Sequence, residues 1–322
     1  MWYSGVRAWR LAGVVAVVSL IGGACRDERG TATSSGANIT VVDGDGDTVR
    51  LAAPARRVIS LVPSATDLIV ALGSKPLLVG RTRYDRDSAL ASIASVGGGL
   101  DPDLERVAAL KPDLVITWWP SKSSELRDRL RAQGIAVYAA PTRDTAAFFA
   151  VDAALGALLG RDSAATALAT AIRDTLRAVH QAVAARPTPS VLYLIWGDPP
   201  MTVGPHTFVG ELIGVAGGRD LFDDATTDWP RVSMEAIVQR APQVIVVAEG
   251  EDAQRGAERM RDTPGWRSLA AVRAGRAVSV PADLMERPGP GLGRAARILA
   301  QAIHPELQGR KVLLQQPLQQ PQ

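Results

Sequence analysis

The pattern of apolar and polar residues over positions 103–118 predicts a short helix, a proline stop and a buried strand. Leucine and valine recur at helical spacing between positions 104 and 110. Pro112 cannot extend a helix, and it disfavours helical angles at Lys111 before it. The continuous apolar run at 114–116 is typical of a parallel strand that is covered on both faces.

The same pattern returns in the segment 234–247, which aligns with 104–117 without a gap. Glu105 falls on Glu235, and the prolines that stop the two helices coincide. A helix, a proline and a strand in succession are common in α/β proteins. The matched glutamates and prolines nevertheless favour a degenerate two-copy repeat, which predicts two similar lobes in one chain.

Strands and helices alternate along the remaining chain, which predicts mostly parallel sheets with helices on both sides. The expected strands are 57–62, 77–80, 135–138, 191–195 and 277–280, and the expected helices are 67–72, 124–133, 211–216 and 294–303. Either Ser64 or Thr66 is placed to cap the first of these helices.

Residues 144–186 contain no proline and no strand-like run, and alanine dominates them. Two helices are expected there, 145–159 and 163–185. At 1.5 Å per residue the second would be roughly 35 Å long, enough to run along a whole lobe.

The beginning of the mature chain, 39–51, predicts a β-hairpin around the turn Asp43-Gly-Asp-Gly-Asp47. Three aspartates in one turn also raise the possibility of a calcium site. The turn lacks the glycine and the distal glutamate of an EF-hand loop, so a plain hairpin turn is favoured.

Length and composition limit the class of protein. The 322 residues can form two ordinary domains, and the 47% hydrophobic content is that of a globular chain. The net charge is only +3, and no run of Lys and Arg with interleaved aromatic residues is present, so a nucleic-acid partner is not expected.

The first 25 residues read as a targeting segment and not as part of the fold. Positive residues and the apolar stretch 11–21 precede small residues and Cys25, the only cysteine. This arrangement resembles a bacterial lipoprotein signal, with Cys25 lipidated and 26–37 as a flexible tether. Gly22 stands where such signals carry a large aliphatic residue, so a secreted protein and an uncleaved anchor stay as alternatives.

Signatures of catalysis and metal binding are nearly absent from the sequence. The three histidines, His180, His206 and His304, lack metal-ligand spacing, and no zinc-protease or serine-hydrolase motif occurs. The glycine-rich segment 289–293 lacks the full dinucleotide-binding pattern. We therefore expect no enzyme, metal site or cofactor. His206 is either an ordinary loop residue or a ligand to the metal of a bound tetrapyrrole.

Aromatic residues stand near the ends of predicted strands in both halves of the chain. Trp118 and Trp196 each follow a strand, and Tyr84 and Trp229 are placed to join them. Ligands of α/β sheets bind outside the carboxyl ends of strands, so these residues are expected to face one cleft. Large aromatic surfaces suit a large flat ligand, although a single tryptophan at a strand end can also cap the core.

Several segments together resemble the periplasmic substrate-binding proteins of ABC importers whose lobes are joined by one rigid helix. They are 57–67, 103–116, the long helix before Pro187, and 229–235. That family takes up vitamin B12, iron siderophores and haem. The resemblance implies an α/β fold in which two Rossmann-like lobes are joined by a single long helix, with the ligand cleft between the lobes. The implied parts are an N-terminal lobe at 38–143, a helical linker at 144–187, a C-terminal lobe at 188–308 and a disordered tail at 309–322.

The chain is most similar to the vitamin B12-binding members of that family. The likeness implies ligand contacts from Ser64, Tyr84, Trp118, Trp196, Trp229, Asp283 and Arg287. Asp283 and Arg287 can equally form a structural ion pair. At 97–99 three glycines stand where those members carry a tryptophan, which removes one stacking surface. A corrinoid, in particular cobalamin, is the expected ligand, and a ferric siderophore or haem is the alternative.

The resemblance also implies a partner. In the family, one surface glutamate on each lobe engages arginines of the membrane subunits, and Glu105 and Glu235 match these positions. A local role at the helix dipole is the alternative for both residues. The expected protein is a monomer in the periplasm or at the cell surface, anchored to the membrane through lipidated Cys25. It would deliver its ligand to an ABC importer, and a two-lobed α/β enzyme is the alternative from another class.

Overall fold

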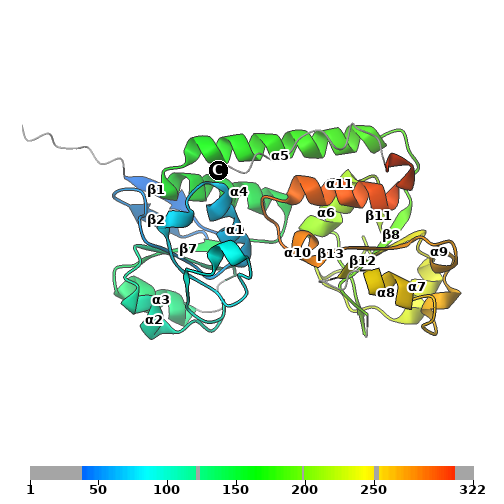
Figure 1. Ribbon diagram of the computed structural model, residues 1–322, viewed down its shortest axis with the longest axis horizontal. Helices are drawn as coiled ribbons and strands as arrows, with labels where there is room; N and C mark the ends of the chain where they lie inside the picture. Colours follow the sequence, from blue (N-terminus) through cyan, green and yellow to red (C-terminus); the bar gives the residue numbers. More distant parts are fainter. Residues whose placement is uncertain (1–37, 121–123, 198, 250–253, 309–322) are drawn as a thin grey trace, which may run out of the picture. The chain divides into compact units, whose positions relative to one another are not determined.

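The computed structural model describes residues 38–120, 124–197, 199–249 and 254–308. The predicted signal segment with Cys25, the tether and the C-terminal tail lie outside the described residues. The described part is a mixed α/β protein that contains two separate parallel sheets (Figure 1). No helix within it is both long and apolar enough to cross a bilayer.

The first parallel sheet has five strands in the order β5-β4-β3-β6-β7. Its strands are β3 (Val58–Ser60), β4 (Leu78–Arg81), β5 (Ala94–Ser95), β6 (Leu114–Trp118) and β7 (Ala136–Ala140), and its helices are α1 (Pro63–Ala71), α2 (Leu104–Ala109) and α3 (Ser124–Ala132). Leu114 and Val115 of β6 are both fully buried, in apolar clusters on opposite faces of the sheet. This confirms the prediction of a strand covered on both sides.

The second parallel sheet has four strands in the order β11-β8-β12-β13. Its strands are β8 (Ser190–Leu194), β11 (Arg219–Asp220), β12 (Val244–Glu249) and β13 (Ala277–Pro281). Its helices are α6 (Phe208–Val215), α7 (Met234–Arg240), α8 (Gln254–Arg259), α9 (Ala270–Arg273), α10 (Ala282–Met285) and α11 (Leu292–Ile303). A small antiparallel pair, β9 (Trp196–Gly197) with β10 (Pro200–Met201), follows β8. Within the described residues the 3-10 helices are η1 (Lys75–Leu77), η2 (Ser88–Leu90), η3 (Trp266–Ser268) and η4 (Pro305–Leu307).

Two helices separate the sheets along the chain, as the sequence predicts. They are α4 (Thr145–Leu159) and α5 (Asp162–Val183), and Gly160 ends the first with a left-handed φ of 64°. Helix α5 packs against α4 and also against α6 and α11 of the second half (Figure 1). Its 22 residues, at 1.5 Å each, make it about 33 Å long.

The predicted repeat is visible in the backbone. Lys111 and Ala241 occupy the same place in the two copies, immediately before the prolines. They are the only non-glycine residues in the described chain with positive φ, at 45° and 47°. A left-handed residue with a side chain is uncommon, so its occurrence at matched positions confirms that both copies end their helix in the same way.

A matched pair of side chains also joins each copy to the neighbouring strand. The Asp113 carboxylate accepts a hydrogen bond from the Arg57 N–H at 3.0 Å, just before β3. At the aligned position, the Gln243 side-chain oxygen accepts from the Ser190 N–H at 2.9 Å, at the start of β8. Each copy therefore fixes the start of its adjacent strand by the same kind of contact.

Three clusters of buried apolar side chains form the core. The largest lies under α1, α4, α5, α6 and α11 and includes inward residues of both sheets. Two smaller clusters cover the opposite faces, one with residues of α2 and α3 and the other with residues of α7 and α9. Helices therefore cover both faces of each sheet, as expected for parallel strands.

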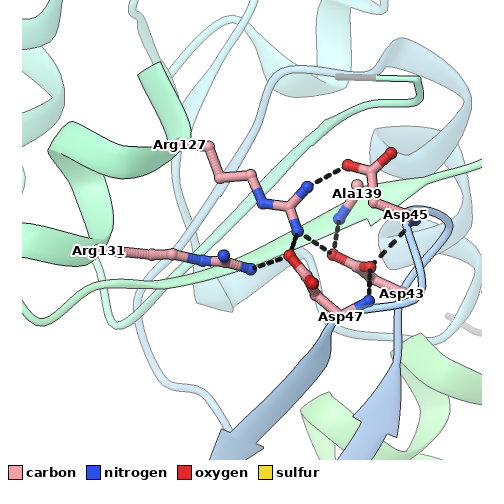
Figure 2. Close-up of polar contacts among 6 residues, drawn as sticks. All are labelled: Asp43, Asp45, Asp47, Arg127, Arg131 and Ala139. Carbon is pink, nitrogen blue, oxygen red and sulfur yellow. Dashed lines mark hydrogen bonds and ion pairs between the residues drawn. The ribbon is translucent and has the colours of Figure 1, made fainter. Parts of the chain in front are cut away.

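The predicted hairpin is confirmed as β1 (Ile39–Val42) paired with β2 (Thr48–Leu51). The carboxylates of its acidic turn surround the guanidinium of an arginine (Figure 2). The guanidinium of Arg127, from α3, contacts the carboxylates of Asp43, Asp45 and Asp47, at 3.2 Å for Asp43. No group of three or more ligand-type side chains in the described chain is arranged to hold a metal ion.

The predicted start of α1 was wrong. The helix begins at Pro63, four residues before the predicted start, so Ser64 and Thr66 lie inside it and do not cap it. Proline is favoured in the first helical turn because its missing N–H is not needed there. The Thr66 hydroxyl instead donates a hydrogen bond to the Val62 carbonyl at 3.3 Å.

Candidate functional site

Three of the predicted ligand residues lie at the carboxyl edge of the first sheet. Ser64 is in the first turn of α1, which follows β3, and Tyr84 is in the loop after β4. Trp118 is the last residue of β6. Because β4, β3 and β6 are consecutive neighbours in the sheet, these residues follow adjacent strand ends.

Trp118 is half-buried, and the glycine loop after β5 packs against its indole. A Cβ added to Gly99 would lie 2.5 Å from the Trp118 Nε1 and 2.4 Å from the Leu61 carbonyl oxygen. No residue other than glycine fits without a shift of the backbone or the indole. The loop that lacks an expected tryptophan thus brings its backbone against Trp118, a contact that sequence spacing alone could not reveal.

The loop that carries Tyr84 is fixed by a buried carboxylate. Asp85 is 4% exposed and accepts hydrogen bonds from the Thr82 N–H and hydroxyl at 2.7 and 2.6 Å. The Tyr84 N–H in turn donates to the Thr82 hydroxyl at 3.1 Å. The Tyr84 ring itself is 46% exposed, so an apolar surface is presented to solvent on an ordered loop.

Arg83 connects this loop to the glycine loop. Its guanidinium lies 3.1 Å from the Asp101 carboxylate and donates to the Tyr84 hydroxyl at 3.3 Å. Hydrogen bonds to Tyr84 and Asp101 raise the pKa of Arg83 above its ordinary value. The loop that carries Tyr84 and the glycine loop that packs against Trp118 are therefore held together by an exposed ion pair.

Trp229 belongs to the second sheet's side of the chain and is 44% exposed. Its segment is held by backbone hydrogen bonds with the residues around β10. The Val232 N–H donates to the Pro200 carbonyl, and the Gly204 N–H donates to the Asp228 carbonyl, both at 2.9 Å. These bonds on either side of Trp229 fix its backbone, although the sequence around Trp229 gives no strand pattern.

The backbone of Trp196 is in β9, where it pairs with Met201 of β10. Its side chain lies outside the described residues, so its predicted ligand contact stays a prediction.

Asp283 and Arg287 come from α10 and the loop after it, beyond the carboxyl end of β13. Asp283 is exposed and Arg287 is half-buried. Burial raises the pKa of Asp67 in α1 to about 6, while the charge of Arg287 opposes that rise and the charge of Asp283 adds to it. Ser64 lines a small cavity together with Pro288, the residue after Arg287.

Glu105 and Glu235 are both exposed and both lie in the first turn of their helices, α2 and α7. The helix ends are capped in matching fashion. Asp103 accepts from the Glu105 N–H at 3.1 Å, and Ser233 accepts from the Ala236 N–H at 3.1 Å. A backbone hydrogen bond at Glu235, with a further one from Ser233, lowers the pKa of the Glu235 carboxyl. Both glutamates therefore present an exposed carboxylate at a helix N-terminus.

His206 is exposed in the turn before α6. Its position leaves the side chain accessible, and it joins no metal-binding group among the residues that the structure describes.

Comparison with known proteins identifies relatives over most of the chain. The family model described as periplasmic binding protein matches residues 58–284. A cobalamin-binding protein of Halobacterium salinarum is 30% identical over 280 residues, which are 83% of this chain and 74% of that protein. An uncharacterised ABC transporter substrate-binding lipoprotein of Bacillus subtilis is 28% identical over 277 residues, 83% of this chain and 86% of its own.

Solved structures of periplasmic binding proteins share this fold. The periplasmic vitamin B12-binding protein of Vibrio cholerae matches with a TM-score of 0.68 at 25% identity, over 82% of this chain and 99% of that one. A periplasmic haem-binding protein from Pseudomonas aeruginosa matches with a TM-score of 0.68 at 27% identity, over 78% and 93%. Proteins described as binding two different kinds of ligand thus share this fold.

Proposed function

The chain belongs to the periplasmic binding protein family, and from this premise we propose that it captures a corrinoid such as cobalamin and delivers it to an ABC importer. That it is a substrate-binding protein of an ABC transporter follows from the family and from its relatives. The family gives the class of protein but not its ligand, and the corrinoid is therefore our proposal. We further propose that the protein acts as a monomer and is anchored through lipidated Cys25.

One observation supports a large flat ligand: both halves of the chain present exposed aromatic side chains, and those of the first half follow strand ends. Tyr84 and Trp229 are 46% and 44% exposed on segments held by hydrogen bonds, and Trp118 is half-buried. Aromatic faces contribute large contact areas at low cost in conformational entropy, which suits a large flat macrocycle. The cobalamin-binding relative at 30% identity favours a corrin over other macrocycles.

Polar groups beside these aromatics suit the periphery of such a ligand. Arg287 and Asp283 follow β13, and their charged groups suit contacts with polar side arms. Ser64, in the first turn of α1, is a small polar residue that is 7% exposed and lines a small cavity with Pro288. We propose that these three residues orient the ligand that the aromatics hold.

Haem is the second candidate, and two observations favour it. A haem-binding protein shares the fold at 27% identity, and His206 is exposed, as an axial ligand to haem iron would need to be. Absorption spectra distinguish the candidates, because His206 coordination would shift the Soret band of added haem. A His206→Ala variant would remove that shift but leave corrinoid binding unchanged.

The proposal is tested by titrating tryptophan fluorescence with cyanocobalamin, haem and ferric siderophores. We expect cyanocobalamin to bind and to quench the emission. Trp118→Ala should weaken binding by about 1–3 kcal/mol, the loss typical of a buried aromatic anchor. Trp266, which is 6% exposed in a core cluster of the second half, provides the control variant Trp266→Phe with unchanged affinity.

Two results would count against this proposal. Binding of a siderophore or haem with no response to cyanocobalamin would replace the corrinoid by that ligand. Equal affinity of Trp118→Ala and the wild type for cyanocobalamin, with the fold intact, would remove Trp118 from the site.

We also propose that Glu105 and Glu235 contact the membrane subunits of the importer. Support comes from their exposure and from their matched places in the repeat. A role at the helix dipole alone does not require the same residue at the same place in both copies.

A further inference from the structure

A pocket of about 190 Å³ opens beside Trp229 at the carboxyl end of β8. It is lined by Tyr193, Ile195, Met201, Val209, Trp229 and Glu286. Pockets for complete small-molecule ligands are usually about 300–1,000 Å³, so this one suits a part of a ligand. At roughly 30 Å³ for each water-sized group, it has room for a short side arm.

The walls of the pocket are apolar except at two points, and the first is Tyr193. This residue is fully buried in β8, and its hydroxyl has no hydrogen-bond partner among the described residues. Burial, together with the charge of Glu286, raises the pKa of the hydroxyl, which keeps it protonated. A buried hydroxyl without a partner is unfavourable, so a ligand atom that reaches it and accepts its proton would be favoured.

The second polar point is Glu286, at the end of α10. Its backbone is fixed by a hydrogen bond from its N–H to the Ala282 carbonyl at 2.8 Å. The residue is exposed, but partial desolvation of its carboxyl, followed by the nearby charge of Asp283, raises the pKa of Glu286, while the charge of Arg287 opposes the rise. The carboxyl of Glu286 accepts hydrogen bonds and repels a second carboxylate in the same pocket.

We propose that this pocket is a subsite for an uncharged carboxamide arm of the ligand, whose carbonyl accepts from Tyr193 and whose N–H donates to Glu286. A primary carboxamide carries both an acceptor and a donor, which match the two polar groups, and its methylene stem suits the walls formed by Met201 and Val209. A carboxylate arm of similar size offers no donor and would meet the charge of Glu286. The inference rests on the proposed corrinoid function and deepens it, because corrinoids carry carboxamide arms whereas haem carries carboxylates.

The test compares amide and carboxylate forms of the same macrocycle. Affinities are measured by fluorescence titration for cyanocobalamin and for its separated monocarboxylates, in each of which one arm amide is hydrolysed. The wild type should bind one of these derivatives at least about tenfold more weakly than cyanocobalamin, because that arm enters the pocket. Haem and its diamide derivative make a second pair that does not depend on the corrin ring.

Two variants assign the effect to the pocket. Tyr193→Phe removes only the hydroxyl and should weaken cyanocobalamin binding about fivefold to tenfold, the loss of one buried hydrogen bond. Glu286→Gln removes the charge and should bring the affected monocarboxylate close to the amide in affinity. The matched controls are Tyr138→Phe, at a buried tyrosine of β7, and Glu258→Gln, at an exposed position of α8.

The possible outcomes separate the subsite from the proposed function. Cyanocobalamin binding that is the same in the wild type and Tyr193→Phe, with no discrimination among the monocarboxylates, overturns the subsite and leaves the corrinoid function standing. Preference for the haem diamide over haem, lost in Glu286→Gln, supports the subsite even where cyanocobalamin does not bind. Binding of neither macrocycle by the wild type rejects both proposals.

Discussion

Two buried aspartates, Asp152 and Asp220, have carboxyl groups whose pKa is raised by the protein interior. Burial raises the pKa of Asp152 in α4 to about 6, and the charge of Arg173 partly opposes that rise. Burial likewise raises the pKa of Asp220 to about 6. Each carboxyl also has a buried oxygen that forms no hydrogen bond with the described residues. Near neutral pH the protein therefore maintains charges that its interior solvates poorly.

We predict that Asp152→Asn stabilises the protein at pH 8 by about 1–3 kcal/mol. The folded-state pKa of about 6 exceeds the ordinary aspartate pKa of 3.8, so between these values the folded state holds more protons than the unfolded state. Wild-type stability consequently falls as pH rises through that window, whereas the asparagine variant lacks this loss. Chemical denaturation of both proteins from pH 4 to pH 8 measures the difference in their free energies of unfolding. A difference that does not change with pH would contradict this explanation.

At the scale of elements, one arginine joins the turn of the first hairpin to the five-stranded sheet and its helix α3 (Figure 2). The Asp43 carboxylate is fully buried and accepts from Arg127 and from the Ala139 N–H at 3.3 Å. The Gly44 N–H donates to the Ala139 carbonyl at 2.8 Å. The turn between β1 and β2 is thereby joined both to α3, which carries Arg127, and to the end of β7.

We predict that Arg127→Met destabilises the protein by about 3–5 kcal/mol, because it leaves the buried Asp43 carboxylate without its cation. Arg131 is the matched control, since it lies on the same helix and contacts only the half-exposed Asp47, at 3.0 Å. Arg131→Met should cost much less, although a hydrogen bond from Arg131 is the main reason that the pKa of Asp47 is lowered. Urea denaturation of both variants checks this, and equal losses would show that burial of Asp43 is not the cause.

At the scale of the whole molecule, the repeat gives each half of the chain an equivalent exposed helix end. Helices α2 and α7 pack on the sheet faces opposite the cluster that α5 covers. Their first turns carry Glu105 and Glu235. A transporter built from two related membrane subunits would meet a pair of such anions with a matching pair of cations.

We predict that Glu105→Arg and Glu235→Arg each impair uptake with the cognate importer but leave folding and ligand affinity nearly unchanged. Exposed charges add little to stability, whereas like charges across an interface cost several kcal/mol. Asp174→Arg, the same reversal at an exposed site of α5, should leave uptake normal. Normal uptake by the double variant Glu105→Arg/Glu235→Arg, expressed at wild-type level, would remove both residues from the docking surface.

The sequence by itself determined the elements and the repeat. Helical spacing in 104–110, the stop at Pro112 and the apolar run after it are local signals, because propensity and burial act within a few residues. The bounds of α4 were predicted to the residue, since Asp144 and Gly160 are strong cap signals at its two ends. The start of α1 was missed because a proline in the first turn outweighed the polar residues that could have capped it.

Only the tertiary structure decided which side chains meet. The contacts of Arg127 with the hairpin aspartates join residues 80 or more positions apart, and no pattern along the chain predicts such a pairing. The close approach of Gly99 to Trp118 and the shared pocket of Tyr193 and Glu286 likewise depend on how loops fold back over strand ends. Periodicity records which face of an element is buried, whereas the partners on that face are fixed by packing among distant segments.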